Sequence, residues 1–288
     1  MLYRNLTHFV AALAAALGAA AANAETPIER GRYLVESIAG CGNCHTPRGP
    51  GGAFVAGKEL AGGFVVADEK PFRAVAANIT QDKETGIGNW TDAQIAKAIR
   101  EGIRPDGSLI GPPMPFELYR RMADSDLMAM VAYLRTVPAV SNKAEKSTYR
   151  IPLPPAYGPP VTSVPDVPRT DKVKYGEYLA GPVGHCIECH TPMEANGRHD
   201  WSRVGQGGME FNGPWGVSVA RNITPHPEDG LGKWTDAEIK RAITQGISRN
   251  GAKLYPPMGF FFYAKVKEED LDAIVAYLRA LKPLPRVK

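Results

Sequence analysis

Two five-residue strings in this chain place a pair of thiols next to a histidine. They are Cys41-Gly42-Asn43-Cys44-His45 and Cys186-Ile187-Glu188-Cys189-His190, and together they hold all four cysteines of the 288 residues. The pattern Cys-x-x-Cys-His is typical of covalent haem attachment. The two thiols can form thioether bonds to the two vinyl groups of one haem, and the adjacent histidine can then bind the iron.

A redox dithiol, or half of a zinc site beside a chance histidine, is the alternative interpretation of a single string. Repetition of the whole string favours haem, so we expect two covalently attached haem c groups. The expected attachment residues are Cys41, Cys44, Cys186 and Cys189, and the expected proximal iron ligands are His45 and His190.

The sixth iron ligand separates an electron carrier from an enzyme, because a closed iron has no position for a substrate. Met114 and Met258 stand at nearly the same distance after the attachment string of their own copy, each in a Pro-Pro-Met loop before an aromatic cluster. A thioether sulfur is a soft ligand that suits haem iron in electron-transfer sites. We therefore predict Met114 and Met258 as the axial ligands.

Most methionines are ordinary hydrophobic residues, and other candidates exist for both ligands. The competing methionines are Met122, Met128, Met130, Met193 and Met209, but only Met114 and Met258 coincide when the two copies are aligned. His185, His199 and His226 remain as alternative ligands, with surface positions the expected role of the last two. Pro47 and Pro192 follow the proximal histidines, and we expect a carbonyl of that turn to accept the second N–H of the imidazole.

The chain repeats itself well beyond the haem-attachment strings. Asn78-Ile79-Thr80 returns as Asn222-Ile223-Thr224, and Trp90-Thr91-Asp92-Ala93 returns as Trp234-Thr235-Asp236-Ala237, with the same offset for both motifs. An offset of half the chain indicates the duplication of a whole domain, because the repeats of solenoids run to about 20–50 residues. Asn78 and Asn222 are candidates for ordering the ligand loop. Trp90 and Trp234 either flank a haem or are core tryptophans.

Helical patterns dominate each copy. Thr91 with Gln94, and Thr235 with Glu238, form capping boxes that predict helix starts. A later stripe in each copy has the spacing i, i+3, i+4, i+7 of a core-facing helix. Its members are Leu127, Met130, Val131 and Leu134, then Leu271, Ile274, Val275 and Leu278. We expect an all-α fold with one domain over residues 25–137 and a second over residues 171–288.

Between the copies lies a proline-rich stretch, residues 138–170. Seven prolines between positions 152 and 168 favour extended chain and cannot continue a helix. We expect a strap that packs along the domain surfaces; a freely flexible tether is the alternative, which the stiffness of proline disfavours.

The first 24 residues have the pattern of a secretory signal peptide. Arg4 and His8 precede an apolar run over residues 9–22, and Ala22-Asn23-Ala24 fits a cleavage site. A membrane anchor is the alternative, but the run is short for one. We expect export to a bacterial periplasm. Cleavage lowers the formal charge from +4 to +3, and four haem propionates bring it near neutrality, so nucleic-acid binding is not indicated.

The Cys-x-x-Cys-His-Thr-Pro strings, the Asn-Ile-Thr and Trp-Thr-Asp motifs and the Pro-Pro-Met loops together resemble class I-like c-type cytochromes. More narrowly, they are similar to the multihaem cytochrome c subunits of periplasmic membrane-bound alcohol, aldehyde and sugar-acid dehydrogenases. The resemblance implies small all-α domains, each with one covalent haem, and ligand pairs His45 with Met114 and His190 with Met258. Those subunits usually have three haem domains and often a C-terminal membrane-associating helix, whereas two copies and no such helix are seen here.

The resemblance also implies the partners. We expect a periplasmic dehydrogenase as electron donor and a cytochrome, oxidase or quinone-linked acceptor, with membrane association through partners. The expected function is single-electron transfer rather than catalysis. The alternative is a dihaem redox enzyme of the peroxidase or thiosulfate-oxidising type; the first needs an iron that can open a position, and the second needs a further cysteine ligand.

Overall fold

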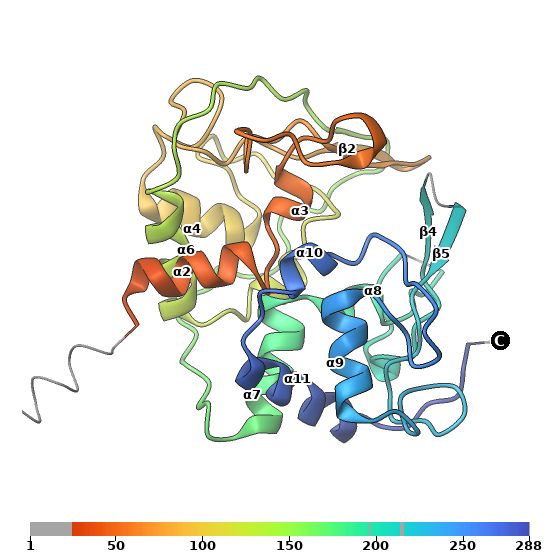
Figure 1. Ribbon diagram of the computed structural model, residues 1–288. Helices are drawn as coiled ribbons and strands as arrows, with labels where there is room; N and C mark the ends of the chain where they lie inside the picture. The colour runs from red at the N-terminus through yellow and green to blue at the C-terminus, as the bar shows by residue number, and fades with distance from the viewer. Residues whose placement is uncertain (1–24, 196, 214–215, 288) are drawn as a thin grey trace, which may run out of the picture.

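The computed structural model describes residues 25–195, 197–213 and 216–287. The predicted signal peptide lies outside these residues. The two copies seen in the sequence form two halves of one body, with the first half around α2, α4 and α6 and the second around α7, α9 and α11 (Figure 1). No helix within the described residues is long and apolar enough to cross a membrane.

The first half is built on a pair of packed helices. Its helices are α2 (Pro27–Glu36), α3 (Gly42–His45), α4 (Asp92–Glu101), α5 (Phe116–Tyr119) and α6 (Asp124–Leu134), with a 3₁₀ turn η1 (Pro50–Gly52). Helix α2 lies so close to α6 that a Cβ on Gly31 would fall 1.8 Å from the carbonyl oxygen of Ala129. Glycine is therefore required for this contact, around which Leu34 and Val131 are fully buried.

The second half repeats this arrangement. Its helical elements are α7 (Lys172–Tyr178), the π-helical η2 (Leu179–Val183), α8 (Cys186–Cys189), the 3₁₀ turn η3 (Trp201–Arg203), α9 (Asp236–Gln245), α10 (Phe260–Tyr263) and α11 (Glu268–Ala280). Gly176 takes the place of Gly31, and a Cβ there would lie 1.8 Å from the carbonyl oxygen of Ala273. The same close helix pair thus forms the core of both halves.

The predicted helix starts are confirmed. Thr91 caps α4 and Thr235 caps α9, each in a reciprocal capping box with the residue three positions later. Gly102 and Gly246 end these helices with φ of 70° and 65°, the left-handed conformation that glycine adopts at low cost.

The expectation of an all-α fold is incomplete, because two small antiparallel sheets accompany the helices. The first contains β1 (Val65–Asp68), β2 (Phe72–Val75) and β3 (Thr148–Tyr149) in that order, and the second contains β4 (Glu210–Gly213) and β5 (Gly216–Val219). The loops that contain these strands include short runs of β-branched and aromatic residues, which pair once the chain folds back on itself. Strand β3 belongs to the proline-rich stretch.

The proline-rich stretch, residues 138–170, is extended and lies against the first half. Beyond the β3 pairing, the hydroxyl of Tyr149 donates to the carbonyl of Pro112 at 3.2 Å and that of Tyr157 donates to the carbonyl of Ile110 at 2.9 Å. The Tyr157 ring stacks on Phe116 with centroids 4.8 Å apart. Its contacts therefore cover the chain on both sides of Met114.

Candidate haem sites

Each Cys-x-x-Cys-His string forms one short helical turn, α3 in the first half and α8 in the second. Residues three apart on a helix share a face, so both thiols of a pair project the same way. All four cysteines are free thiols, and each is half-buried. The structure thus presents two pairs of thiols, and neither pair forms a disulfide.

The two histidines predicted as proximal ligands have matching hydrogen bonds in the two halves. Nδ1 of His45 lies 2.7 Å from the carbonyl oxygen of Ala77, and Nδ1 of His190 lies 2.6 Å from that of Arg221. Because a carbonyl oxygen only accepts, Nδ1 carries the proton and Nε2 keeps the lone pair that binds a metal. Both imidazoles are therefore set in the tautomer of an iron ligand.

The accepting carbonyl does not come from the turn that contains Pro47 or Pro192, so that expectation is wrong. The Pro47 carbonyl accepts from the backbone N–H of Val55, and the Pro192 carbonyl accepts from that of Asp200. The proline carbonyl in the turn after each histidine thus already accepts a backbone hydrogen bond. A segment well beyond this turn in each half supplies the acceptor instead.

The Asn-Ile-Thr motifs hold that segment in place. Asn78 is buried next to Ala77, donates to the carbonyl of Val140 at 2.8 Å and accepts from the backbone N–H of Thr80 at 2.9 Å. Asn222 repeats the pattern with Leu284 and Thr224, at 2.7 and 2.9 Å. Each asparagine ties the histidine's acceptor to the chain that follows the last helix of its half.

The cysteines and histidines lie in desolvated surroundings without being fully covered. Burial raises the pKa of Cys41 to about 12 and the pKa values of Cys44 and Cys186 to about 11, and it lowers the pKa of His45 and of His190. Each of these residues nevertheless keeps some solvent-accessible surface. Paired thiols beside an imidazole, in largely apolar surroundings and not fully covered, are the donor set that covalent haem attachment uses. The residues present fit haem c.

The Pro-Pro-Met loops lead into helices that reach the cysteines. Burial raises the pKa of Tyr119 in α5, as do the neighbouring Cys41, Glu188 and Cys44. Burial likewise raises the pKa of Tyr263 in α10, as do Cys186, Cys189 and Cys44. Helix α5 begins two residues after Met114 and α10 two residues after Met258, and both methionines are half-buried. Their assignment as iron ligands stays a prediction.

The competing candidates have other surroundings. Met122 and Met130 are fully buried in the core, and Met128 and Met193 are exposed. His185 lies 3.3 Å from Glu188, His199 lies 3.8 Å from Glu117, and Nδ1 of His226 accepts from the backbone N–H of Asp229. Trp90 and Trp234 pack against the hydrophobic core, which favours the core interpretation of both.

The two attachment strings lie against each other's halves, a relationship that the sequence analysis missed. Asn43, inside the first string, donates to the carbonyl of Pro257 at 3.2 Å, next to Met258. His185, just before the second string, packs edge-on against Tyr119 with ring centroids 6.0 Å apart. Because Tyr263 neighbours Cys44 as well as Cys189, the two sites face one interface.

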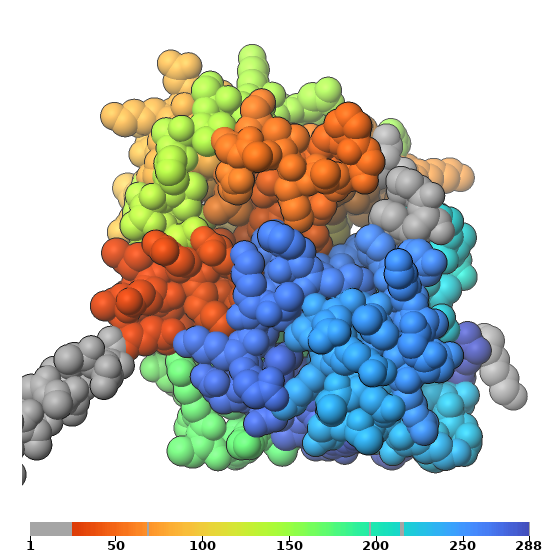
Figure 2. All heavy atoms as spheres, in the orientation of Figure 1, coloured from red at the N-terminus to blue at the C-terminus, as the bar shows by residue number. Residues whose placement is uncertain are grey.

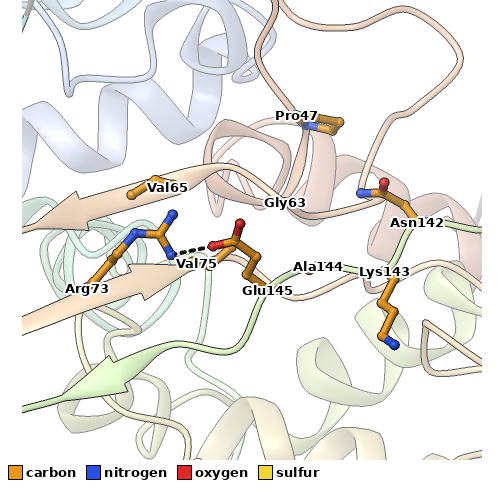
Figure 3. Close-up of a pocket in the computed structure, with 9 residues that line it drawn as sticks. All are labelled: Pro47, Gly63, Val65, Arg73, Val75, Asn142, Lys143, Ala144 and Glu145. Atoms are coloured by element: carbon orange, nitrogen blue, oxygen red, sulfur yellow. Dashed lines mark hydrogen bonds and ion pairs between the residues drawn. The ribbon is translucent and has the colours of Figure 1, made fainter.

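A pocket of about 290 Å³ lies near the first site but is not part of it (Figure 3). Pro47 and Asn142 line it, and the ion pair of Arg73 with Glu145, 2.7 Å long, crosses it. It contains no cysteine, histidine or methionine, and the Glu145 side chain is largely exposed. A second pocket, beside Lys240 and Glu268, likewise lacks these residue types.

The comparisons with known proteins agree with one another on the family. The cytochrome c family profile matches residues 175–282. The fructose dehydrogenase cytochrome subunit of Gluconobacter japonicus is 32% identical over 275 residues, which are 90% of this chain and 54% of that protein. The cytochrome c subunit of the quinone-dependent alcohol dehydrogenase of Gluconobacter oxydans is 30% identical, over 99% of this chain and 61% of that protein. The chain therefore spans only a little over half the length of these relatives.

A further relative is of similar size. The dihaem cytochrome c-type protein of Cereibacter sphaeroides is 30% identical over 254 residues, which are 83% of this chain and 81% of that protein. Such coverage carries the relationship across both halves, including the first, which the family profile does not reach. The chain has two Cys-x-x-Cys-His turns and two histidines whose Nε2 keeps a lone pair for a metal, and it belongs to the c-type cytochromes.

Proposed function

We propose that the chain is a periplasmic dihaem electron-transfer protein made of two cytochrome c domains joined by the proline-rich stretch. The domains are residues 25–137 and 171–288, and the linker is residues 138–170. One haem is attached at Cys41 and Cys44, with iron ligands His45 and Met114, and the other at Cys186 and Cys189, with iron ligands His190 and Met258.

The observation that carries the proposal is the repetition of the histidine–carbonyl bond. Both halves fix Nδ1 on a carbonyl oxygen, at 2.7 Å in the first and 2.6 Å in the second, and leave Nε2 for iron. A structural duplicate that had lost its cofactor would have no reason to keep an imidazole oriented in this way. The repeated bond therefore supports two haems rather than one.

The names of the relatives support the choice of partner. The fructose and alcohol dehydrogenase relatives are cytochrome subunits of dehydrogenases, and a gluconate 2-dehydrogenase cytochrome c subunit from Pantoea cypripedii is 28% identical. The leader pattern of residues 1–24 supports export to the periplasm. We infer a periplasmic dehydrogenase as donor and a downstream respiratory acceptor.

Haem supplies the one-electron chemistry, by cycling its iron between the ferric and ferrous states. The chain's own residues would hold it: the thiols would tether it, and the histidines and methionines would bind its iron. Tyr119 and Tyr263 are buried beside the cysteines of their own halves. Because both sites face one interface, an electron can pass between them without leaving the protein.

The enzymatic alternative has less support. A thiosulfate-oxidising site would need a cysteine ligand, and all four cysteines of the sequence belong to the attachment strings. A peroxidase would need one iron without its methionine, whereas both copies keep the Pro-Pro-Met sequence, and the tyrosine five residues after each methionine lies near the cysteines of its own half.

Haem counting tests the proposed function. In secreted protein, a pyridine haemochrome assay should find two haems per chain, and one in each of the variants Cys41→Ala/Cys44→Ala and Cys186→Ala/Cys189→Ala. Oxidised wild-type protein should accept two electrons per chain. A single haem in wild type, or hydrogen peroxide turnover by the diferric protein, would contradict it.

A further inference from the structure

The faces around the two Pro-Pro-Met loops differ, although the loops themselves are copies. In the first half, position 111 is glycine, and a Cβ there would lie 2.3 Å from the Tyr149 ring. Tyr149 and Tyr157 bind the carbonyls of Pro112 and Ile110, so the proline-rich stretch covers this face. Phe116 beneath it is 2% exposed.

In the second half, the corresponding face is open in the part of the chain that the structure describes. Tyr255 stands where the first half has Gly111, and 55% of it is exposed. Phe261 stands where the first half has Glu117, and 62% of it is exposed. The blue atoms of α9 and α10 and the loop between them form the front of the lower half of the molecule in Figure 2, bordered above by the orange atoms of the first half.

Phe261 is part of a larger aromatic cluster. Phe261 lies 5.5 Å from Phe54 of the first half and 5.4 Å from Phe262, measured between ring centroids. Phe262 in turn packs against Gly42 of the first attachment string, 2.9 Å from the position of a Cβ there. The open face thus lies over the place where the two candidate haem sites meet.

The segment that carries the open face contains basic but no acidic residues. Residues 239–267 contain six lysines and arginines and no acidic residue, whereas the corresponding residues 95–123 contain five basic and three acidic residues. Lys240, Arg249 and Lys267 are paired with acidic side chains outside this segment. Lys253 and Lys265 are exposed and have no acidic partner within the described residues, and Nζ of Lys265 lies 5.0 Å from the Phe261 ring centroid.

We propose that this aromatic, lysine-rimmed face of the second half, around Tyr255, Phe261, Lys253 and Lys265, is the docking surface for a redox protein that presents an acidic rim around an apolar centre. The proposal rests on the proposed function and adds to it an asymmetry: electrons enter or leave beside Met258, while the covered face beside Met114 serves only internal transfer. Charge complementarity steers such encounters, and the exposed aromatic rings supply the contact.

Plastocyanin, an acidic copper protein, serves as the probe. The reduced dihaem protein is oxidised by it in a stopped-flow experiment, with Lys265→Glu as the test variant and Arg121→Glu, at the same repeat position in the first half, as the matched control. At low salt we expect Lys265→Glu to lower the bimolecular rate constant about fivefold and Arg121→Glu by less than about 1.5-fold. The difference should vanish in about 1 M salt, where the Debye length is about 3 Å.

Phe261→Glu, which gives the second half the residue of the first, should lower the same rate constant at both salt concentrations. Equal effects of Lys265→Glu and Arg121→Glu in proteins that hold two haems would overturn the docking surface alone. Wild-type protein without haem would overturn the proposed function, and this proposal with it.

Two other occupants of the face are separate outcomes. Sedimentation that shows a wild-type dimer dissolved by Phe261→Glu would assign the face to a second copy of the chain. Binding to phosphatidylglycerol vesicles that Lys265→Glu abolishes, with unchanged plastocyanin kinetics, would assign it to a membrane surface. Either result would overturn the proposal.

Discussion

The hydroxyl of Tyr33 lies 2.6 Å from Oδ2 of Asp270, which belongs to the opposite half of the molecule. The copies of these residues make the reverse bond: Tyr178 of the second half donates to Asp126 of the first at 2.7 Å. The halves are therefore related by a local two-fold arrangement, as in an isologous dimer whose subunits have been fused. This arrangement brings both attachment strings to one interface.

The two bonds differ in whether the aspartate has a second side-chain donor. Asp126 also accepts from Arg30 at 2.8 and 3.0 Å, but position 175, the copy of Arg30, is tyrosine. Tyr33→Phe leaves the buried Asp270 without the side-chain donor seen here and should lower the free energy of unfolding by about 2 kcal/mol. Tyr178→Phe should cost about 1 kcal/mol, because Arg30 still pairs with Asp126. Guanidinium unfolding followed by circular dichroism measures both; a larger loss for Tyr178→Phe would contradict the interface described.

The close contact of α2 with α6 makes Gly31 intolerant of a side chain. Gly31→Ala places Cβ 1.8 Å from the Ala129 carbonyl oxygen, so the helices must separate, and we expect a loss of about 3 kcal/mol. Gly49→Ala is the control, since its Cβ would have no atom nearer than 3.8 Å and its φ is −91°. The control should change stability by less than about 0.5 kcal/mol. Comparable thermal midpoints for the two variants would show that the helices are not held this closely.

Asp124 links the proline-rich stretch to α4 and gives a pH-dependent contribution. Partial burial acts to raise its pKa, but a hydrogen bond from Ser163 and the ion pair with Arg100 outweigh it and lower the pKa below 3.8. A carboxylate with a lowered folded-state pKa stabilises fully above the unfolded-state pKa and stops doing so as the pH falls through the folded-state value.

The difference in thermal midpoint between wild type and Asp124→Asn should therefore be constant from neutral pH down to about pH 5 and shrink steadily below the ordinary carboxyl pKa of 3.8. Ser163→Ala, which removes one donor, should show part of the same effect. A difference that does not change with pH would mean that the carboxylate charge has no role there.

Asn78 and Asn222 should act on their own haem sites through the carbonyls of Ala77 and Arg221. Loss of the asparagine frees the acceptor segment, so the histidine loses its fixed orientation and the reduction potential of that haem changes. In a redox titration with two resolved waves, Asn78→Ala should move one wave and Asn222→Ala the other. Asn89→Ala, at an exposed asparagine that donates to Lys83, is the control and should move neither. Movement of both waves by one variant would point to a general loosening instead.

A structural feature can be predicted from the sequence where the residues that determine it are close together along the chain. Capping residues such as Thr91, helix-ending glycines such as Gly102 and the i, i+3 spacing of Cys41 and Cys44 act within one or two turns, so their structural effect follows from the sequence alone. The carbonyl of Ala77, which accepts from His45, lies far from that histidine along the chain, and strand β3 lies far from its partner β2. Neither spacing nor composition encodes such partners, which only the folding of the first half and of the stretch that follows it brings together.

The two faces beside the methionine loops illustrate the same limit. The substitution pair Gly111 and Tyr255 is visible when the copies are aligned, but its meaning depends on Tyr149 lying against Gly111. Without that contact, Tyr255 is one more aromatic residue in a loop. With it, the difference between a covered and an open face becomes apparent.

The central claim is that each half closes its own iron with a histidine and a methionine. The most direct measurement is the near-infrared charge-transfer band of the oxidised protein, which reports a sulfur–iron bond, normalised to haem content. We predict a band of two-site intensity in wild type, half that intensity in Met114→Ala and in Met258→Ala, and none in the double variant, with Met128→Ala unchanged. A full-intensity band in the double variant, or a wild-type band that either single variant abolishes, would contradict the claim.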